Sequence, residues 1–244
     1  PVDSEHFSIW SVINKHQKSN IEKIILTASG GPFLNKRYKK KISPEEATNH
    51  PNWKMGKKIS VDSATLMNKI FEVIEAKNIF DLSYDKISIL IHPVSYVHAI
   101  VEFKNGLTKI LIHETSMHIP IYNTLYYDRN IEKINSNNIN LRKLNKLNLT
   151  KPNLNKFQSL SIKKLLPNKT SLFETVLITV NDEIVKLFLE KKLKFNQIIP
   201  LIIKIIKMKE FSKFKKIQPK NLDKITELNR LVRFKIESLV YKFT

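Results

Sequence analysis

Three carboxylates in two separate segments are the side chains of this sequence best suited to holding a divalent cation. Asp3 and Glu5 lie two residues apart near the start, and Glu72 follows much later in the segment 60–72. On an extended segment, side chains at i and i+2 project to the same face, so we expect Asp3 and Glu5 to face one way. Carboxylate oxygens are ligands that Mg²⁺ and Mn²⁺ prefer. Taken alone, a D-x-E pattern more often marks an exposed acidic strand end.

Polar side chains close to Glu72 are suited to binding a phosphate group. Asn68 and Glu72 are four residues apart, so they share one face of a predicted helix, and Lys69 lies beside them. Ser63 and Thr65 lie near the predicted helix start, where free N–H groups and a partial positive charge favour an anion. The alternative is an ordinary amphipathic helix with capping residues.

The segment 50–56 joins a titratable imidazole, His50, to a large aromatic ring, Trp53, among residues that favour turns. A Trp on a loop can close over a bound ligand and exclude water, although it can equally pack on the body of the protein. We expect the remaining histidines of the central region to be structural residues rather than ligands: His92, His98, His113 and His118.

The elements that must position these residues predict a mixed α+β or α/β fold. Residues 1–126 predict a catalytic domain with a central mixed, partly antiparallel sheet and helices on one side. Its expected strands are 24–26, 87–91, 96–103 and 108–113, with a two-residue hairpin turn at Asn105-Gly106 and one helix over 62–80. Gly30 and Gly31 follow the first strand and allow close approach to a ligand.

The remainder of the chain predicts a linker and a small helical bundle. Residues 127–152 are rich in Asn, Lys and Leu without clear periodicity, which indicates a linker with one short strand. Residues 153–244 show helical periodicity over 154–165, 171–192, 196–207 and 222–241.

Composition limits the classes of partner. The 244 residues contain no Cys, which excludes disulfides and thiolate metal sites. No apolar run approaches the roughly 18 residues of a membrane span, so we expect a soluble protein without a membrane partner. The net charge of +20 suggests a Lys-rich nucleic-acid-binding module, with helices near 186–220 contacting phosphates, as the alternative function. Only five of the 42 basic residues are Arg, the preferred residue for such recognition, so we favour a small-molecule partner and no nucleic acid.

Five short blocks, in this order, resemble the 1-deoxy-D-xylulose 5-phosphate reductoisomerase family. They are PVDSEH at 1–6, ASGGPF at 28–33, HPNWKMGKK at 50–58, ISVDSAT at 59–65 and MNK at 67–69. The resemblance is strong over residues 1–121 and weaker afterwards, where VNDEI at 180–184 is similar to an Asn-Glu signature of the family. Lys54, Ile70 and Val94 depart from the residues usual in the family.

The resemblance implies a role for each site residue. It implies metal ligands at Asp3, Glu5 and Glu72, with His50 and Trp53 also in the catalytic site. It implies substrate contacts at Ser4, Glu5, Ser29, His50, Ser63, Asn68, Lys69 and Glu72, and places the phosphate at Ser29, Ser63, Asn68 and Lys69. Residues 29–57 would form a flexible loop, with Trp53 over the substrate and Met55 and Gly56 near the nicotinamide cofactor.

The implied reaction is the metal- and NADPH-dependent conversion of 1-deoxy-D-xylulose 5-phosphate, a phosphorylated ketose, to 2-C-methyl-D-erythritol 4-phosphate. The implied metal is Mn²⁺, Mg²⁺ or Co²⁺, and the implied assembly is a homodimer through the central sheet. The expected location is the bacterial cytoplasm, with a plastid-type organelle as the other compartment. The family has an N-terminal NADPH-binding domain, and this sequence, which starts at Pro1, contains no G-x-G-x-x-G motif. We therefore expect a fragment that is inactive alone.

Overall fold

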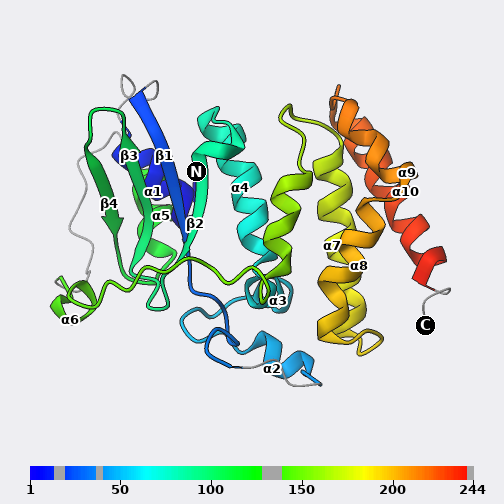
Figure 1. The fold of residues 1–244 in the computed structure, drawn as a ribbon, viewed down its shortest axis with the longest axis horizontal. Coiled ribbons are helices and arrows are strands. Elements are labelled where there is room, and N and C mark those ends of the chain that lie inside the picture. Colours follow the sequence, from blue (N-terminus) through cyan, green and yellow to red (C-terminus); the bar gives the residue numbers. More distant parts are fainter. Residues whose placement is uncertain (14–19, 37–40, 128–138, 241–244) are drawn as a thin grey trace.

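A four-stranded mixed sheet is the centre of the first half of the chain (Figure 1). The computed structural model describes residues 1–13, 20–36, 41–127 and 139–240. The strands are β1 (Ile21–Ala28), β2 (Ile87–Ile91), β3 (Val97–Phe103) and β4 (Thr108–Ile112), in the spatial order β2-β1-β3-β4. β1 runs parallel to β2 and antiparallel to β3, and β3 is antiparallel to β4, which confirms the predicted mixed, partly antiparallel sheet.

The β3–β4 hairpin has a longer turn than predicted. Gly106 has a left-handed backbone, with φ of 84°. Phe103 N–H donates to the carbonyl of Leu107 at 2.9 Å, so residues 104–106 form the connection rather than Asn105-Gly106 alone. Glycine at the last of three loop positions is a common hairpin solution.

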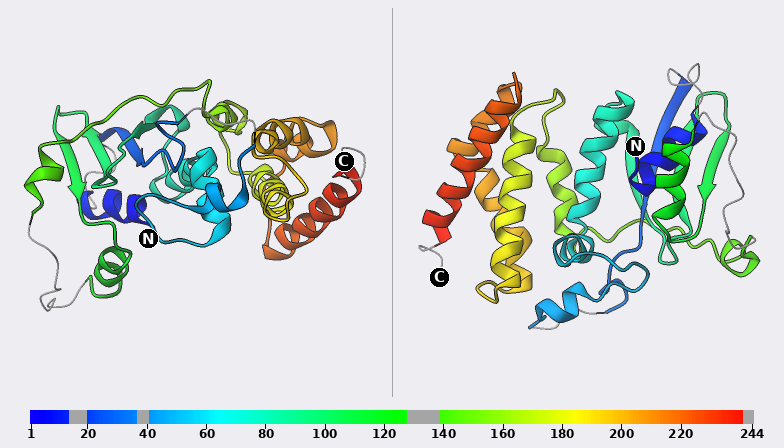
Figure 2. Two further views of the ribbon diagram at one scale, coloured as in Figure 1. Left: turned by 90° about the horizontal axis from the view of Figure 1, so that it is seen from below. Right: turned by 180° about the vertical axis from the view of Figure 1, so that it is seen from behind.

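Helices cover one face of the sheet, as predicted. α1 (Ser4–Val12) packs on β3 and β4, α4 (Met67–Phe80) packs on β1 and β2, and α5 (His118–Leu125) packs on α1 (Figures 1 and 2). Alternation along the strands sends Leu26 and Val101 into the main core on this face. The two β1 and β3 residues Ile25 and Ile100 point to the opposite face.

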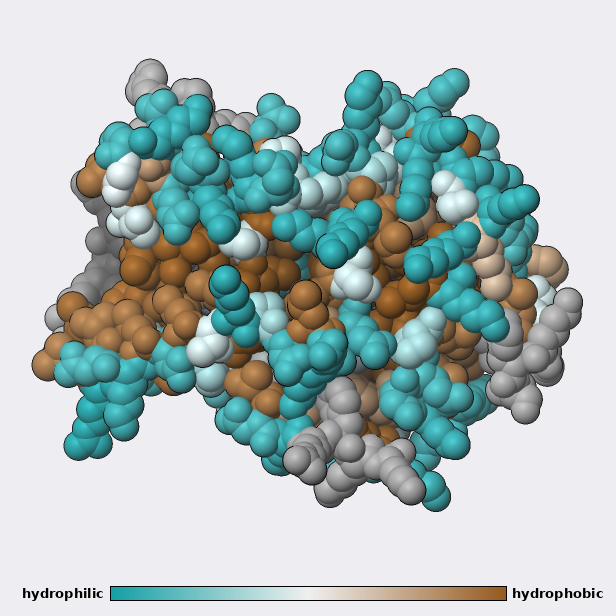
Figure 3. Space-filling model, viewed as in Figure 1, coloured by the Kyte–Doolittle hydropathy of each residue, from teal (hydrophilic) through white to brown (hydrophobic). Residues whose placement is uncertain are grey.

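The opposite face of the sheet has no helix among the described residues and is partly covered by the segment around Leu147 and Leu149. Ile110 on β4 pairs with Ile100 and keeps 46% of its surface exposed. Apolar residues gather over this end of the molecule in the space-filling view (Figure 3). A continuous apolar surface of this kind commonly marks a contact with another protein.

The single helix predicted over 62–80 is wrong, because the chain breaks at Leu66. α3 (Lys57–Thr65) ends there and α4 begins at Met67, with Leu66 in the left-handed region at φ 57°. Ser63 therefore lies in the last turn of a helix rather than near a helix start. A left-handed Leu is strained, and propensity alone gives no signal for it.

The extended segment predicted for Asp3 to Glu5 is also wrong. Asp3 is the N-cap of α1, and its Oδ1 accepts hydrogen bonds from the backbone N–H groups of Glu5 at 3.1 Å and His6 at 3.4 Å. Asp is a strong N-cap residue, and that preference prevails over an extended conformation here. α2 (Pro44–Thr48) begins with a capping box between Ser43 and Glu46.

The C-terminal half is helical, as predicted, with α7 (Phe173–Leu189), α8 (Ile198–Ile206) and α10 (Leu222–Val240) as its longer helices. The predicted helix 154–165 is instead the 3-10 helix η3 (Gln158–Leu165). Shorter elements are η2 (Tyr84–Lys86), α6 (Leu141–Leu144), η4 (Phe195–Gln197), α9 (Lys209–Ser212) and η5 (Lys213–Lys216). Across the described ranges, each helix is too short or too polar to cross a membrane.

The main core runs without interruption from the sheet into these helices, joining Leu26 and Met67 to Val180 and Ile202. Part of the predicted linker, 128–138, lies outside the described residues. The short strand expected in it corresponds to one antiparallel bridge between Thr150 and Ile91. The division at 1–126, 127–152 and 153–244 stays a prediction.

Candidate metal and phosphate site

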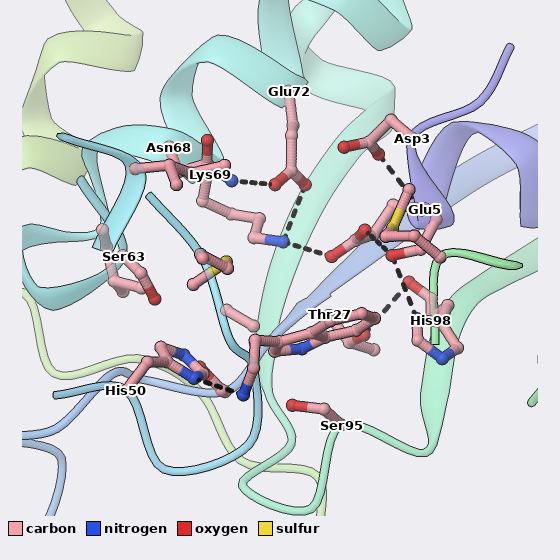
Figure 4. A pocket seen from close by; sticks show the side chains of 18 of the residues that line it. Asp3, Glu5, Thr27, His50, Ser63, Asn68, Lys69, Glu72, Ser95 and His98 are labelled. Carbon is pink, nitrogen blue, oxygen red and sulfur yellow. Dashed lines mark hydrogen bonds and ion pairs between the residues drawn. The ribbon is translucent and has the colours of Figure 1, made fainter. Parts of the chain in front are cut away.

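The three carboxylates meet at one point between α1 and α4. One oxygen each from Asp3, Glu5 and Glu72 lies within 4.8 Å of the others. Asp3 and Glu5 come from the cap and first turn of α1, and Glu72 comes from the second turn of α4. The arrangement brings together residues almost 70 positions apart, as the close-up shows (Figure 4).

His6 anchors the acidic end of this cluster. Its Nδ1 lies 2.9 Å from Asp3 Oδ1, and its Nε2 lies 3.0 Å from the carbonyl oxygen of Glu72. Burial alone would raise the pKa of Asp3, but the hydrogen bond and charge of His6 outweigh it and lower that pKa to about 2. Asp3 is therefore ionised at neutral pH, and His6 connects α1 to α4.

Lys69 supplies the positive charge between the carboxylates. Its Nζ lies 2.6 Å from Glu5 Oε1 and 2.7 Å from Glu72 Oε2, and the residue is 5% exposed. Burial disfavours the ammonium, but the two carboxylates outweigh that cost and raise the pKa of Lys69. The ammonium thus occupies the place where a bound cation would neutralise the same oxygens.

The donor set fits a hard divalent cation. Glu72 is 4% exposed, and within the described part of the chain its Oε2 accepts no hydrogen bond of good geometry, although Lys69 Nζ is 2.7 Å away. Burial and the Glu5 carboxylate raise the pKa of Glu72 well above its ordinary value. An under-satisfied, oxygen-only set with this charge is what Mg²⁺ or Mn²⁺ would stabilise. Asn68 Nδ2 fixes the other oxygen, Glu72 Oε1, at 2.5 Å.

The hydrogen bonds of the His50 ring determine which of its two nitrogens carries the proton. Its Nδ1 accepts the backbone N–H groups of Asn52 at 3.1 Å and Trp53 at 3.0 Å, so the proton lies on Nε2. Nε2 then donates to Ser29 Oγ at 2.9 Å, and Gly31 N–H donates to the same oxygen at 3.1 Å. Burial lowers the pKa of His50, which favours this neutral form. The hydroxyl proton of Ser29 therefore remains available to an anion.

The loop before α3 is held against the far wall of the cavity. Asn52 Nδ2 donates to the carbonyl of Pro93 at 2.7 Å and to Ser95 Oγ at 2.9 Å. These bonds place the Trp53 ring 6.2 Å from the ring of His98, with the two planes at 75°. At the base of the same loop, a side chain at Gly31 would collide with the Ser63 carbonyl at 2.9 Å, so only Gly fits there.

One cavity of about 270 Å³ receives these side chains. Every predicted site residue lines it except Gly56, which is the N-cap of α3: Asp3, Ser4, Glu5, Ser29, His50, Trp53, Met55, Ser63, Asn68, Lys69 and Glu72. In Figure 4, Ser63 and His50 lie on one side, the carboxylates lie on the other, and Lys69 reaches between them. Their catalytic and binding roles stay predictions.

Several lining residues were not predicted as site residues, among them Thr27, Ser95 and His98. His98 was expected to be structural, and its buried ring does contact Ser4 Oγ at 3.2 Å and the His113 carbonyl at 3.1 Å. It nevertheless also faces the cavity. Only the antiparallel pairing of β3 with β1 brings it there, a contact that no local pattern indicates.

Fold and cavity together define an α/β domain that presents a candidate cation site beside a candidate anion site. Two sequence-family models match the chain: the 1-deoxy-D-xylulose 5-phosphate reductoisomerase C-terminal domain over residues 1–80 and the DXP reductoisomerase C-terminal domain over residues 112–235. The chain belongs to the 1-deoxy-D-xylulose 5-phosphate reductoisomerase family.

Individual relatives agree with this assignment. The 1-deoxy-D-xylulose 5-phosphate reductoisomerase of Pelagibacter ubique is 54% identical over 241 residues, covering 98% of this chain and 62% of the relative. That of Persephonella marina is 43% identical over 215 residues, covering 87% of this chain and 57% of the relative. The chain thus spans roughly three fifths of the length of these curated relatives.

Solved structures show the same fold. A DOX-P reductoisomerase in complex with NADPH, fosmidomycin and magnesium superposes with a TM-score of 0.87 at 33% identity, covering 99% of this chain and 63% of that one. A DOX-P reductoisomerase in complex with magnesium gives a TM-score of 0.84 at 29% identity, covering 100% of this chain and 62% of that one.

Proposed function

We propose that this chain forms the metal- and substrate-binding part of an enzyme that converts 1-deoxy-D-xylulose 5-phosphate to 2-C-methyl-D-erythritol 4-phosphate. The observation that carries the proposal is the division of one cavity into a carboxylate end and a hydroxyl, amide and ammonium end. A ketose phosphate has the matching parts, since vicinal oxygens can chelate a cation while the phosphate is held separately.

Asp3, Glu5 and Glu72 would hold the divalent ion. A bound ion supplies Lewis-acid polarisation of the ketose carbonyl during the skeletal rearrangement, and NADPH supplies the hydride for the reduction. Magnesium is named in three solved relatives of this fold, and Mn²⁺ and Co²⁺ are the other candidates for this donor set. The contribution of this chain is to fix the three carboxylates through Asp3 capping, His6 and Asn68.

Ser29, Ser63, Asn68 and Lys69 would bind the phosphate. Ser29 can donate its hydroxyl proton because its oxygen already accepts from His50 and Gly31. Asn68 and Lys69 lie in the first turn of α4, at the positive end of the helix dipole. When the phosphate is bound, Trp53 would close the cavity and exclude water, which strengthens each of these charged contacts.

The nicotinamide would approach the cavity beside Met55 and Gly56. Met55 lines the cavity and Gly56 begins α3 next to it. Solved relatives are named as complexes with NADPH. Because these 244 residues contain no G-x-G-x-x-G motif, we expect tight NADPH binding and turnover to need residues beyond them.

Calorimetric titration of the purified chain with 1-deoxy-D-xylulose 5-phosphate in the presence of Mn²⁺ tests the proposed site. Ser63→Ala should weaken binding about tenfold, because a hydrogen bond to a charged group contributes roughly 1.5–3 kcal/mol. Ser60→Ala is the matched control, since Ser60 lies on the same helix but bonds the Gly56 carbonyl at 2.9 Å. Equal affinity of wild type and Ser63→Ala would remove Ser63 from the phosphate site. In the full-length protein, substrate-dependent oxidation of NADPH tests the reaction itself.

We also propose that the exposed sheet face forms a homodimer interface with a second copy of the chain. Its supports are Ile110, which is 46% exposed, and the small apolar cluster of Ile25 and Ile100 beside it, which the segment around Leu147 and Leu149 covers only in part. Ile110→Lys should shift the chain from dimer to monomer in sedimentation equilibrium, because it buries a charge in an apolar contact. Ile178→Lys, at a 40% exposed position on α7, is the control. A wild-type chain that sediments as a monomer at all concentrations would refute the interface.

The nucleic-acid-binding alternative is not proposed. Its only support is the charge of the Lys-rich segment 186–220, which forms the end of α7 and the elements through η5. Family membership and the polar cavity both favour a small-molecule partner over a nucleic acid.

A further inference from the structure

A buried carboxylate outside the cavity ties the site to the C-terminal helices. Asp62 on α3 is 1% exposed, and its Oδ1 accepts a hydrogen bond from Asn181 Nδ2 at 2.9 Å. Asn181 lies on α7, 119 positions further along the chain, and is fully buried. Lys58 Nζ, one turn earlier on α3, lies 2.8 Å from Asp62 Oδ2. Together they give the buried charge one ammonium and one amide partner.

The cluster of Asp62, Lys58 and Asn181 is a weak source of stability. Burial raises the pKa of Asp62, and the contacts with Lys58 and Asn181 only partly oppose this rise. Buried ion pairs are often no more stabilising than well-packed apolar residues of similar volume, because desolvation offsets their attraction. Asn181 Oδ1 in addition has no hydrogen-bond partner among the described residues. Stability alone therefore does not account for three polar side chains at this packed contact.

What the cluster does fix is the orientation of the last turn of α3. Ser63 follows Asp62 directly and lines the cavity, whereas Asp62 points away to α7. The turn then breaks at Leu66, and α4 starts with the candidate phosphate residues Asn68 and Lys69. A rotation of α3 about its axis would move Ser63 out of the cavity and shift the start of α4.

Further charged residues on α7 and α10 contact Lys58 directly or through one another. Lys58 Nζ lies 3.0 Å from Asp182 Oδ1 on α7, and Asp182 lies 3.8 Å from Arg233 on α10. Arg233 also pairs with Glu183. α3 lies near the lower end of α4 in Figure 1 and contacts both α4 and α7, so this chain of contacts runs from the site helices into the bundle.

We propose that Asp62, Asn181 and Lys58 are positioning residues that hold Ser63 and the α3–α4 junction in the geometry needed to bind the substrate phosphate. The proposal rests on the proposed function and assigns to the C-terminal helices a part in substrate recognition. None of the three touches the substrate. Their effect is larger at the phosphate end of the cavity than at the carboxylate end, because Asp3 and Glu5 are held by α1.

The test compares two affinities of the same purified chain, for Mn²⁺ alone and for 1-deoxy-D-xylulose 5-phosphate with Mn²⁺ saturating. Asn181→Leu removes the donor to Asp62 and should weaken sugar-phosphate binding about tenfold, since small misplacements of binding groups have effects of this order or larger. Mn²⁺ affinity should fall much less, because Asp3 and Glu5 belong to α1 and the Glu72 backbone carbonyl is held by His6 at 3.0 Å. Lys58→Met, at a position whose side chain is 44% exposed, should act in the same direction.

Rescue distinguishes positioning from a general loss of stability. The exchange Asp62→Asn with Asn181→Asp keeps both the amide–carboxylate hydrogen bond and the net charge, and should recover most of the sugar-phosphate affinity. Thr179→Val is the matched control, since buried Thr179 lies on α7 two residues before Asn181 and its Oγ1 donates to the Thr175 carbonyl of the same helix at 2.8 Å. It should leave both affinities unchanged.

Two results would overturn the inference. In one, Asn181→Leu and Lys58→Met bind the sugar phosphate as wild type does. In the other, they lose Mn²⁺ and sugar-phosphate affinity by one common factor, which indicates general destabilisation. A wild-type chain that binds Mn²⁺ but no sugar phosphate would instead refute the proposed function, and the two failures are thereby distinguished.

Discussion

Replacing Glu72 with Gln is expected to weaken Mn²⁺ binding by about 10- to 100-fold or more. Removing a group that only supports a metal ligand already weakens binding by about this factor, so removing a ligand should have at least the same effect. Glu72 brings one of three converging carboxylates, and Gln keeps its shape while losing the charge. Asn68 and Lys69 would lose an ionised partner, but α4 should remain folded because its apolar residues are unchanged. Quenching of Trp fluorescence or electron paramagnetic resonance of free Mn²⁺ measures the affinity.

Glu75→Gln is the matched control for this substitution. Glu75 lies one turn further along α4, its side chain is 51% exposed, and its nearest ionisable partner is His6 at 3.6 Å. Its replacement should change Mn²⁺ affinity less than about twofold, as expected for an exposed ion pair. If the two variants bind Mn²⁺ equally well, the carboxylate cluster is not the metal site.

Acid should weaken Mn²⁺ binding by wild type earlier than an ordinary carboxylate site would. Burial and Glu5 raise the pKa of Glu72, so protons compete for it at a higher pH. Metal affinity is then fully present above the raised pKa and decreases as the pH falls through it. Glu72→Gln removes this group, and its residual Mn²⁺ affinity should depend less on pH over the same interval.

The sequence predicted the sheet well, and the residues it proposed for the site line one cavity apart from Gly56, because both depend on local signals. Strand runs with turn residues between them located all four strands. The site residues were found from motifs that lie within short segments, and the fold needed only to bring these segments together. The N-cap role of Asp3 was missed even though Asp followed by a helix is a local signal, because the i, i+2 spacing was given priority.

The features that could not be predicted depend on contacts between distant segments. Leu66 adopts a left-handed backbone against its own preference, which surrounding packing must enforce. His98 reaches the cavity through strand pairing, and Asn181 reaches Asp62 through helix packing. Periodicity identifies which face of an element is buried but not what covers that face.

Lys69→Met is expected to change the two affinities of the site in opposite directions. The ammonium now lies 2.6 and 2.7 Å from oxygens that a metal ion would need, so a cation must displace it. Without Lys69 the carboxylates attract Mn²⁺ unopposed, and Mn²⁺ affinity should rise. The sugar phosphate loses a charge-assisted contact and should bind at least about tenfold more weakly, as for a hydrogen bond between charged groups.

The same substitution should make folding depend on the metal. Removing the ammonium leaves Glu5 and the buried Glu72 without their shared counter-charge, which costs about 3–5 kcal/mol in buried pairs. Mn²⁺ at 100 times its dissociation constant should return about 2.7 kcal/mol of unfolding free energy. Urea denaturation with and without Mn²⁺ measures both the loss of unfolding free energy and its recovery. Lys77→Met, on the same helix with an exposed ammonium near Thr170 at 3.3 Å, should show neither effect.

The direction of the Mn²⁺ response decides what Lys69 does in the metal-free protein. A rise means that the ammonium competes with the cation and is released toward the phosphate when the metal binds, which would couple the two ends of the cavity. A fall in Mn²⁺ affinity together with sugar-phosphate affinity would mean that Lys69 holds the carboxylates in place for the metal, and the competition would be refuted. The coupling has a second consequence, because reciprocity requires Mn²⁺ to raise sugar-phosphate affinity by the same factor as the sugar phosphate raises Mn²⁺ affinity.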